Sequence, residues 1–453
     1  MNERVNPTVL ELQKEGILLV EDGNHGEYRP RPAEFCDQGV AYIRAADMDA
    51  GRVLFESSQK ITEPAVKRIT KGIGAPGDIL LSHKGTVGKT ALVPEDAPPF
   101  VCSPQTTFWR TKDERRLNRK YLYAFMRSPG FRAQLASRAG ETDMAPYVSL
   151  TSQRGLTVVL PPINDQVGIA DALGPLDDKI ELIRQMNETL EATARALFND
   201  WLVGFGPTRA KMDKRAPYLA ENLWSLFPDR FGDDGLPAGW GFSTLGSLLT
   251  VLETGGRPKG GISGYSSGVP SVGAESITGL GKFDFAKTKY VPEDFFKSMN
   301  KGRIENRDVL LYKDGGRPGL FEPHVTLFGD GFPFETFAIN EHVYRMRVVE
   351  SFGQNSLYFW LTTDSVQAEM RIKGTGVAIP GLNSTQAKSL SVVVPSRNAA
   401  AIFDQMLDPF ITRILANCNE SRSLAQTRDF LLPRLMARAI RVRDAETIVR
   451  DVT

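Results

Sequence analysis

PPINDQVGIADALGPLDDKIELIRQMNETLEATARALFNDWLV occupies residues 161–203, and this stretch decides the fold. From Ile169 to Trp201 its apolar residues recur at alternating steps of three and four, which is the spacing of a heptad seam along one helix face. A helix cannot bury so long a seam against itself. The pattern therefore predicts a second helix of similar length as its partner.

Residues 395–435 repeat this stretch at a constant offset and predict that partner helix. We expect the two helices to pair antiparallel along a seam formed by Leu173, Ile180, Asn187, Leu190, Leu197, Leu407, Ile414, Ser421, Leu424 and Leu431. Asn187 and its equivalent Ser421 are predicted to face each other as a polar layer that fixes the register. Gly174–Pro175 interrupts the first helix, and we expect a kink there because proline removes a backbone donor.

A chain of 453 residues predicts more than one domain. Its 41% hydrophobic and 24% charged residues are ordinary for a globular protein, and its net charge of +1 argues against a strongly basic nucleic-acid binder. Local basic faces remain compatible with that charge. The three cysteines lie far apart and predict neither a disulfide framework nor a zinc site, which indicates the cytoplasm. We identify no signal peptide and no membrane span.

A globular domain precedes each long helix, and the two domains resemble each other. GVAYIRAADM (39–48) matches GVPSVGAESI (268–277), and the segment ending at Pro94 matches the one ending at Pro323. The sequence predicts an α+β fold, in which two similar α/β domains are separated by two long antiparallel coiled-coil helices in a pseudo-twofold duplication. The expected parts are domain one (1–163), a helix (164–204), a linker (205–240), domain two (241–396), a helix (397–440) and a C-terminal tail (441–453).

Within domain one the sequence predicts several elements. We expect helices over 8–14, 119–127 and 130–138, a strand over 39–48, a strand–turn–strand over 77–94 and a closing strand over 155–162.

Two motifs resemble catalytic ones and fail on a decisive residue. GTVGKT (85–90) lacks the first glycine of a phosphate-binding loop, because His83 stands there. DAPPF (96–100) resembles the Asn/Asp-Pro-Pro-aromatic motif of adenine methyltransferases, but Ala97 cannot hold the target amine. No histidine has a ligand-like neighbour, so we expect neither a catalytic centre nor a metal site.

Polar loops supported by glycines remain as candidate binding surfaces. Arg, Lys, Asn and related side chains are those that reach base edges and phosphates in DNA. The candidates in domain one are Asn24, His25, Tyr28, Arg29, Arg31, Arg44, Lys84, Thr86, Lys89, Tyr147 and Ser149. Those in domain two are Arg257, Lys259, Tyr265, Lys313, Arg317, Lys373 and Asn383. We expect roughly half of these candidates to be ordinary solvated loop residues that do not contact DNA.

The layout resembles the DNA-specificity subunits of type I restriction–modification enzymes. The resemblance covers nearly the whole chain and rests on GDILLSHKGTVGKTALVP, LPPINDQVGIADAL, GPTRAKMDKR and LFPDRFGDDGLPAGW, in addition to the first long helix. It implies a non-catalytic cytoplasmic subunit that binds double-stranded DNA, two methyltransferase subunits and further restriction subunits. Each domain would read one half of a split site, and the helices would set the gap. S-adenosylmethionine would belong to the methyltransferase subunits, with no cofactor in this chain.

Two other classes stay open at this point. A stand-alone bipartite DNA-binding regulator would need a strong basic face of its own, which the near-neutral charge disfavours. A coiled-coil scaffold that binds proteins through both domains would tolerate loops poor in Arg, Lys and Asn. These loops are rich in them.

Overall fold

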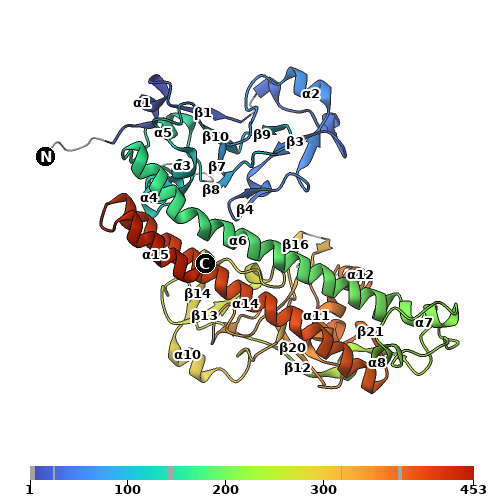
Figure 1. The fold of residues 1–453 in the computed structure, drawn as a ribbon. Helices are drawn as coiled ribbons and strands as arrows, with labels where there is room; N and C mark the ends of the chain where they lie inside the picture. The colour runs from blue at the N-terminus through green and yellow to red at the C-terminus, as the bar shows by residue number, and fades with distance from the viewer. Residues whose placement is uncertain (1–5, 24–25, 140–145, 318, 376–379) are drawn as a thin grey trace. The chain divides into compact units, whose positions relative to one another are not determined.

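The computed structural model describes residues 6–23, 26–139, 146–317, 319–375 and 380–453. The chain forms two compact units (Figure 1): unit 1 comprises residues 1–179 and 424–453, and unit 2 comprises residues 180–423. Two long helices, α6 (Ile163–Phe198) and α14 (Arg397–Met436), belong in part to each unit. Within the described ranges no helix is both long and apolar enough to span a membrane.

Unit 1 is built on two four-stranded sheets. One has the order β1 (Leu18–Asp22), β10 (Thr106–Thr111), β7 (Ile79–Lys84) and β8 (Thr86–Leu92), and all its pairs are antiparallel. The other has the order β2 (Phe35–Cys36), β6 (Gln59–Ile61), β3 (Val40–Ile43) and β9 (Phe100–Cys102). The remaining elements are the hairpin β4 (Met48–Asp49) and β5 (Arg52–Val53), and the helices α1 (Val9–Lys14), α2 (Glu63–Arg68), α3 (Arg119–Met126), α4 (Pro129–Ala139), α5 (Leu150–Arg154) and α15 (Val442–Val452).

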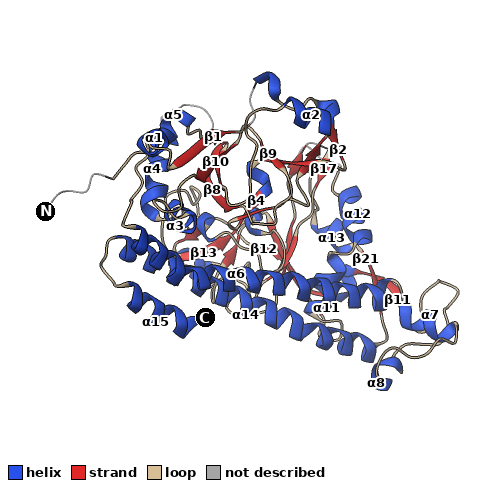
Figure 2. Cartoon of the chain, turned by 45° about the horizontal axis from the view of Figure 1, so that its top comes forward, coloured by secondary structure: helices blue, strands red, loops and turns tan. Residues whose placement is uncertain are grey.

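Unit 2 repeats this plan. Its antiparallel sheet has the order β12 (Leu249–Thr254), β20 (Val343–Val348), β15 (Val309–Tyr312) and β18 (Val325–Leu327), and its second sheet the order β14 (Lys289–Val291), β13 (Val269–Val272) and β19 (Ala338–Ile339). Two short pairs join β11 (Gly241–Thr244) to β21 (Ser391–Val394) and β16 (Gly316–Arg317) to β17 (Leu320–Phe321). The helices are α7 (Gly206–Met212), α8 (Glu221–Trp224), α9 (Leu245–Leu248), α10 (Glu293–Ser298), α11 (Gln354–Leu361), α12 (Asp364–Lys373) and α13 (Ser384–Lys388) (Figure 2).

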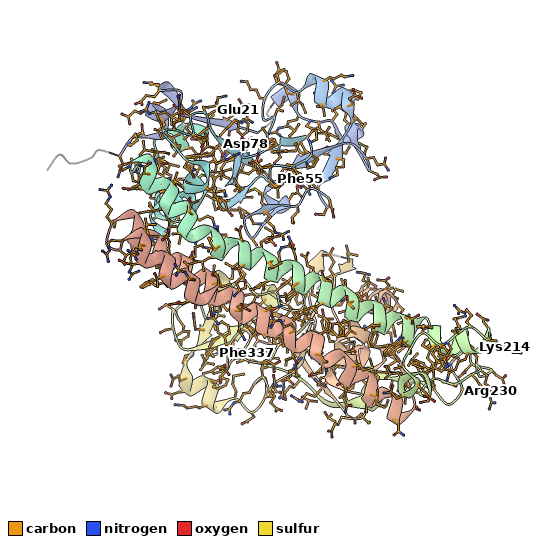
Figure 3. The ribbon with its side chains drawn as sticks, in the orientation of Figure 1. Glu21, Phe55, Asp78, Lys214, Arg230 and Phe337 are labelled. Atoms are coloured by element: carbon orange, nitrogen blue, oxygen red, sulfur yellow. The ribbon has the colours of Figure 1, made fainter. Side chains whose placement is uncertain are left out.

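Equivalent carboxylates brace the sheets of both units, which confirms the duplication. In unit 1 Glu21 accepts a hydrogen bond from the Gly72 amide at 2.8 Å, and in unit 2 Glu253 accepts one from Gly302 at 2.8 Å. Asp78 is fully buried, and its carboxylate receives two hydrogen bonds from the Arg110 guanidinium. Glu21 comes from β1 and Asp78 from the start of β7 (Figure 3).

The buried Asp308 takes the place of Asp78 in unit 2 and pairs with Arg345 and Arg347. Buried carboxylates persist only when they are paired in this way. The two units therefore share a rigid charged brace beneath loops that differ.

The long helices run antiparallel within each unit. In unit 1 Asp165 pairs with Arg438, and Asp177 pairs with Arg428 at 2.7 Å. A later residue of the first helix thus meets an earlier residue of the second, so the two helices run in opposite directions. In unit 2 the Asn417 amide donates to Asn187 at 2.7 Å, and the rings of Trp201 and Phe403 lie 5.6 Å apart. The antiparallel prediction is thus confirmed.

The seam residues differ in how deeply they are buried. Those that are buried are Leu173, Leu407, Ile414, Leu424 and Leu431, and those that are half-buried are Ile180, Asn187, Leu190, Leu197 and Ser421. The seam is therefore apolar and deep at some layers and open to solvent at others.

One detail of the helix prediction requires correction. Asn187 contacts Asn417 and Cys418 instead of Ser421, one turn away, because a seam residue enters a hole between several residues of the facing helix. Pro175 lies inside α6, which continues to Phe198, and the kink expected at Gly174–Pro175 stays a prediction. The carbonyl that loses its donor belongs to Asp171, an exposed residue whose backbone water can reach.

The expected closing strand over 155–162 is also wrong. Thr157 forms only an isolated bridge with Thr8, because Pro7 has no amide to donate and helix α1 begins at Val9. In unit 2 the equivalent segment is the strand β21, which has β11 as a full partner. The predictions over 8–14, 77–94, 119–127 and 130–138 are confirmed by α1, β7–β8, α3 and α4. Only Val40–Ile43 of the strand predicted over 39–48 is a regular strand before a short 3₁₀ turn.

The C-terminal tail forms helix α15, which packs on α6 inside unit 1. The Val442 side chain lies 3.3 Å from where a Cβ on Gly168 would stand, so the glycine allows the close approach. At the other end of α15, Lys179 donates to the Thr453 carbonyl at 2.9 Å. A third helix therefore joins the helix pair in unit 1.

The Asn187–Asn417 contact predicts unequal effects of two substitutions. Asn417 is fully buried and Asn187 is half-buried, so Asn187→Leu leaves a buried amide without its oxygen partner, whereas Asn417→Leu leaves an amide that water reaches. We expect Asn187→Leu to lower the unfolding free energy by about 1–3 kcal/mol and Asn417→Leu by less. Chemical denaturation of both variants measures this. Gln185→Leu, at an exposed position of the same helix, is the control, and equal losses for Asn187→Leu and Asn417→Leu would contradict the argument.

Candidate functional site

In unit 1 several chain segments converge at one end of the antiparallel sheet. The β1 strand ends at Asp22, and the amide of the next residue, Gly23, donates to the Thr106 carbonyl at 2.9 Å. The β7 strand ends at Lys84, and the amide of the residue before it, His83, donates to the Gln105 carbonyl at 2.9 Å. The amide of Val148, just before α5, donates to His83 at 2.9 Å. The loops after β1 and β7, before β10 and before α5 therefore meet at this end.

Unit 2 builds the same end with equivalent contacts of β15 to the segments before β20 and before α13, whereas the amide after its first strand has a different partner. The Gly255 amide donates to Asn340 at 3.2 Å, that of Lys313 to His342 at 3.1 Å, and that of Leu382 to Lys313 at 2.6 Å. Lys84 of unit 1 thus corresponds to Asp314 of unit 2, because each forms a β-bridge to the segment before the following short helix. By the same register Gln105 corresponds to His342. Asp22 and Thr254 end the first strands at equivalent places, since Asp22 pairs with Thr107 and Thr254 with Tyr344.

A glycine is required where each first strand ends. A Cβ on Gly23 would lie 1.8 Å from the Ser103 carbonyl oxygen, and a Cβ on Gly255 would lie 1.6 Å from the Ile339 carbonyl oxygen. No side chain fits at either distance. The close approach joins the loop after the first strand to the segment that carries Gln105 or His342.

Unit 1 has a basic cavity of about 280 Å³ at this end. Its lining residues are Arg29, Tyr42, Arg44, Lys84, Ser103, Pro104 and Gln105. Burial raises the pKa of the Tyr42 phenol to about 12, so the hydroxyl stays protonated and can donate at neutral pH. The Lys84 ammonium lies 5.8 Å from the centroid of the Tyr147 ring, and the His83 ring packs on the same tyrosine. The cavity can therefore donate to acceptor groups or bind anions.

Several predicted site residues also hold the fold together. Arg44 makes a bidentate pair with Asp47, and the Lys89 ammonium donates to the carbonyls of Ala45 and Met48. Ser149 caps α5 and Asn383 caps α13. Lys373 donates to Ser389 and pairs with Glu369. Their contact with nucleic acid stays a prediction, and their replacement would also disturb local structure.

The other predicted residues are placed as follows. Tyr28, Arg29, Arg31, Thr86, Lys259 and Tyr265 are exposed, and Tyr147 is half-buried beside Lys84. Arg257 pairs with Glu341 at 2.9 Å, and Lys313 with Asp314 at 2.7 Å. Asn24 and His25 lie outside the described residues, as does the side chain of Arg317.

Sequence reasoning missed Tyr42 and Gln105 in unit 1 and Asp314, Glu341 and His342 in unit 2. Asp314 lies between the candidates Lys313 and Arg317 in a glycine-rich loop, but it is acidic, and the criterion for candidates favoured basic and amide side chains. The other four residues lie outside such loops. The duplication carried the missing signal, since alignment of β7 with β15 places Asp314 opposite Lys84. In the described part of the chain, no three His, Cys, Asp or Glu side chains gather as metal ligands.

Comparison with known proteins shows what the chain is similar to. Residues 19–192 match the type I restriction modification DNA specificity domain. The chain is 22% identical to the specificity subunit of the type I restriction enzyme MjaIX of Methanocaldococcus jannaschii, over 91% of this chain and 89% of that protein. It is 24% identical to the HindI specificity subunit of Haemophilus influenzae, over 64% and 70%.

Among solved structures, the S subunit of a type I restriction–modification system from M. genitalium is similar. It aligns with 96% of this chain and 97% of its own, at 14% identity and a TM-score of 0.46.

The glycine contact in unit 2 yields a sharp test. Gly255→Ala forces its methyl against the Ile339 carbonyl, whereas the adjacent Gly256 has open space around its Cβ position. We expect Gly255→Ala to lower the thermal midpoint of unfolding by several degrees, through roughly 1–3 kcal/mol of strain, and Gly256→Ala to leave it unchanged. Calorimetry of the two variants decides, and equal midpoints would refute the close approach.

Proposed function

We propose that the chain is a specificity subunit of a type I restriction–modification enzyme and that it selects the DNA sequence on which such an enzyme acts. Each unit reads one half of a bipartite site. The long helices α6 and α14 set the spacing between the halves and dock the methyltransferase subunits. We propose that the two DNA-recognition domains comprise residues 1–163 and 241–396.

One observation carries this proposal. Equivalent backbone contacts in the two units present different side chains at the same sheet end, such as Lys84 in unit 1 and Asp314 in unit 2. A shared frame with divergent loops is what two readers of different sequences need, because base identity is read by side chains and not by the frame.

The charge distribution fits a subunit that works inside a complex. The whole chain carries a net charge of only +1, while the cavity of unit 1 is lined by Arg29, Arg44 and Lys84. Phosphate contacts dominate the affinity of DNA-binding proteins. A DNA-binding subunit with a net charge near zero therefore depends on its partner subunits for much of its affinity. We propose double-stranded DNA, two methyltransferase subunits and further restriction subunits as the partners, in the cytoplasm.

The chain has no catalytic role in this proposal. His83 is fully buried and its Nδ1 contacts the Val148 carbonyl, and Lys89 is bound to backbone carbonyls, so the segment around Gly88 serves the fold. The methyl donor and the chemistry belong to the partners. The alternative function is a stand-alone DNA-binding regulator. Such a regulator would bind its full site tightly at physiological salt without partner subunits, which a specificity subunit would not.

Exchange of one domain tests modular reading. Replacement of residues 1–163 by the corresponding domain of a relative should change one half of the methylated motif and leave the other half and the spacing intact. Replacement of residues 241–396 should change only the other half. Methylation-site sequencing of a host that carries the complete system reads out both exchanges. If either exchange changes both halves of the motif, or changes neither, the two domains do not recognise their half-sites independently.

The purified chain should show no methyltransferase, nuclease or ATPase turnover. The complex reconstituted with methyltransferase subunits, assayed on the same DNA with S-adenosylmethionine, is the positive control. Activity of the chain alone that disappears in Lys89→Ala or Pro98→Ala would show that one of the two rejected motifs is catalytic. Tight, salt-resistant and sequence-specific binding by the chain alone would instead favour the regulator.

A further inference from the structure

The two units offer opposite hydrogen-bonding groups at one equivalent position, a donor at Lys84 in unit 1 and an acceptor at Asp314 in unit 2. At the end of β7 and before β10, unit 1 presents the donors Lys84 and Gln105. At the matching ends of β15 and before β20, unit 2 presents Asp314 and His342, with Glu341 beside them. The register is fixed by backbone hydrogen bonds on both sides, so the inversion is a property of the side chains.

The acidic groups of unit 2 lie in a chain of polar contacts. The Asp314 carboxylate accepts from the Lys313 ammonium at 2.7 Å and contacts His342 Nδ1 at 2.8 Å. His342 Nε2 lies 3.5 Å from Glu341, which pairs with the Arg257 guanidinium at 2.9 Å. These contacts fix the Asp314 carboxylate in one orientation. Its side chain is 20% exposed, so one edge of the carboxylate still faces solvent.

A carboxylate at a DNA-reading surface can face few groups. Phosphates repel it, and the acceptors on guanine and thymine offer it no proton. The amino groups of cytosine and adenine in the major groove do donate, and Asp and Glu are the side chains that accept from cytosine. Each carboxylate oxygen has more than one acceptor position, so Asp314 can receive a further hydrogen bond while it keeps those from Lys313 and His342.

From this geometry we propose that Asp314 is a specificity-determining residue, which accepts a hydrogen bond from the exocyclic amino group of a cytosine or adenine in the half-site read by unit 2. Lys313 and His342 hold the carboxylate in place. Lys84, at the equivalent position of unit 1, donates to an acceptor in the other half-site. This assignment rests on the proposed function and adds the class of base edge that unit 2 reads.

The experiment uses the complete complex with its methyltransferase subunits and the variants Asp314→Ala and Asp314→Asn. Asp294→Asn is the matched control, because it removes the same charge from an exposed residue of α10 in the same unit. Methylation-site sequencing gives the motif, and binding to the unmodified site gives the affinity. The exchange of residues 241–396 identifies the half-site that unit 2 reads.

We expect Asp314→Ala to relax one position in that half, to leave the other half unchanged and to weaken binding to the original site roughly 10- to 100-fold. Asp314→Asn keeps the shape and one acceptor oxygen, so it should alter the preference at the same position with a smaller loss. Asp294→Asn should change neither motif nor affinity. Lys84→Met should act only on the half read by unit 1.

If Asp314→Asn leaves the motif unchanged and binds DNA equally well or more tightly, the proposal is overturned. That result is expected when the carboxylate lies beside a phosphate, or when it contacts no base. Relaxation in the half read by unit 1 would overturn it as well. If Asp314→Ala fails to fold by circular dichroism, Asp314→Asn alone decides. A wild-type complex that methylates no bipartite site would instead refute the proposed function, and this outcome is seen before any variant is tested.

Discussion

The antiparallel pairing of α6 with α14 is the constraint on which the rest of the structure depends. Each unit contains the beginning of one helix and the end of the other, so neither unit is complete without both halves of the chain. Burial of a leucine such as Leu173 or Leu431 contributes about 1.5–3 kcal/mol, and such residues recur along the seam. The polar contact of Asn187 with Asn417 contributes less, since a net hydrogen bond is worth about 1 kcal/mol. Apolar burial therefore contributes most of the free energy that holds the helices together.

Each sheet is attached to this helix pair by polar contacts that differ between the units. In unit 1 Asp177 of α6 is shared between Arg428 of α14 and Arg127 at the end of α3, at 2.7 and 2.8 Å. In unit 2 Asp404 of α14 receives the amide of Ser356 at 2.8 Å, while Glu191 of α6 accepts from Tyr358 at 3.1 Å. Arg428 is only 8% exposed, so loss of its partner would leave a buried charge. These contacts fix the orientation of each sheet on the helices, and with it the end that carries the candidate DNA-reading loops.

The braced sheets explain how one frame can serve two specificities. Asp78 and Asp308 hold the starts of β7 and β15 in the same way, and Gly23 and Gly255 bring the next loop against the same backbone. Beyond these points the side chains are free to differ, because none of them is needed for the brace. Replacement of Lys84 by Asp at the equivalent position changes the chemistry of the surface without a change in the fold, which is how a duplicated domain can acquire a second target.

The sequence by itself determined the two long helices, their antiparallel pairing and the duplication, because heptad spacing and internal repeats are patterns along the chain that do not depend on the details of packing. It also placed α1, α3, α4 and the β7–β8 hairpin. Tertiary structure alone decided that Asn187 meets Asn417 and not Ser421, since helix packing interleaves side chains and spacing cannot show the hole that each one enters. It alone decided that residues 155–162 form no strand, because the neighbour that would pair with them begins with Pro7 and turns into a helix. Most of all, it brought Tyr42, Lys84 and Gln105 to one cavity, and Asp314 and His342 to the matching place, because backbone hydrogen bonds between distant strands create those neighbourhoods.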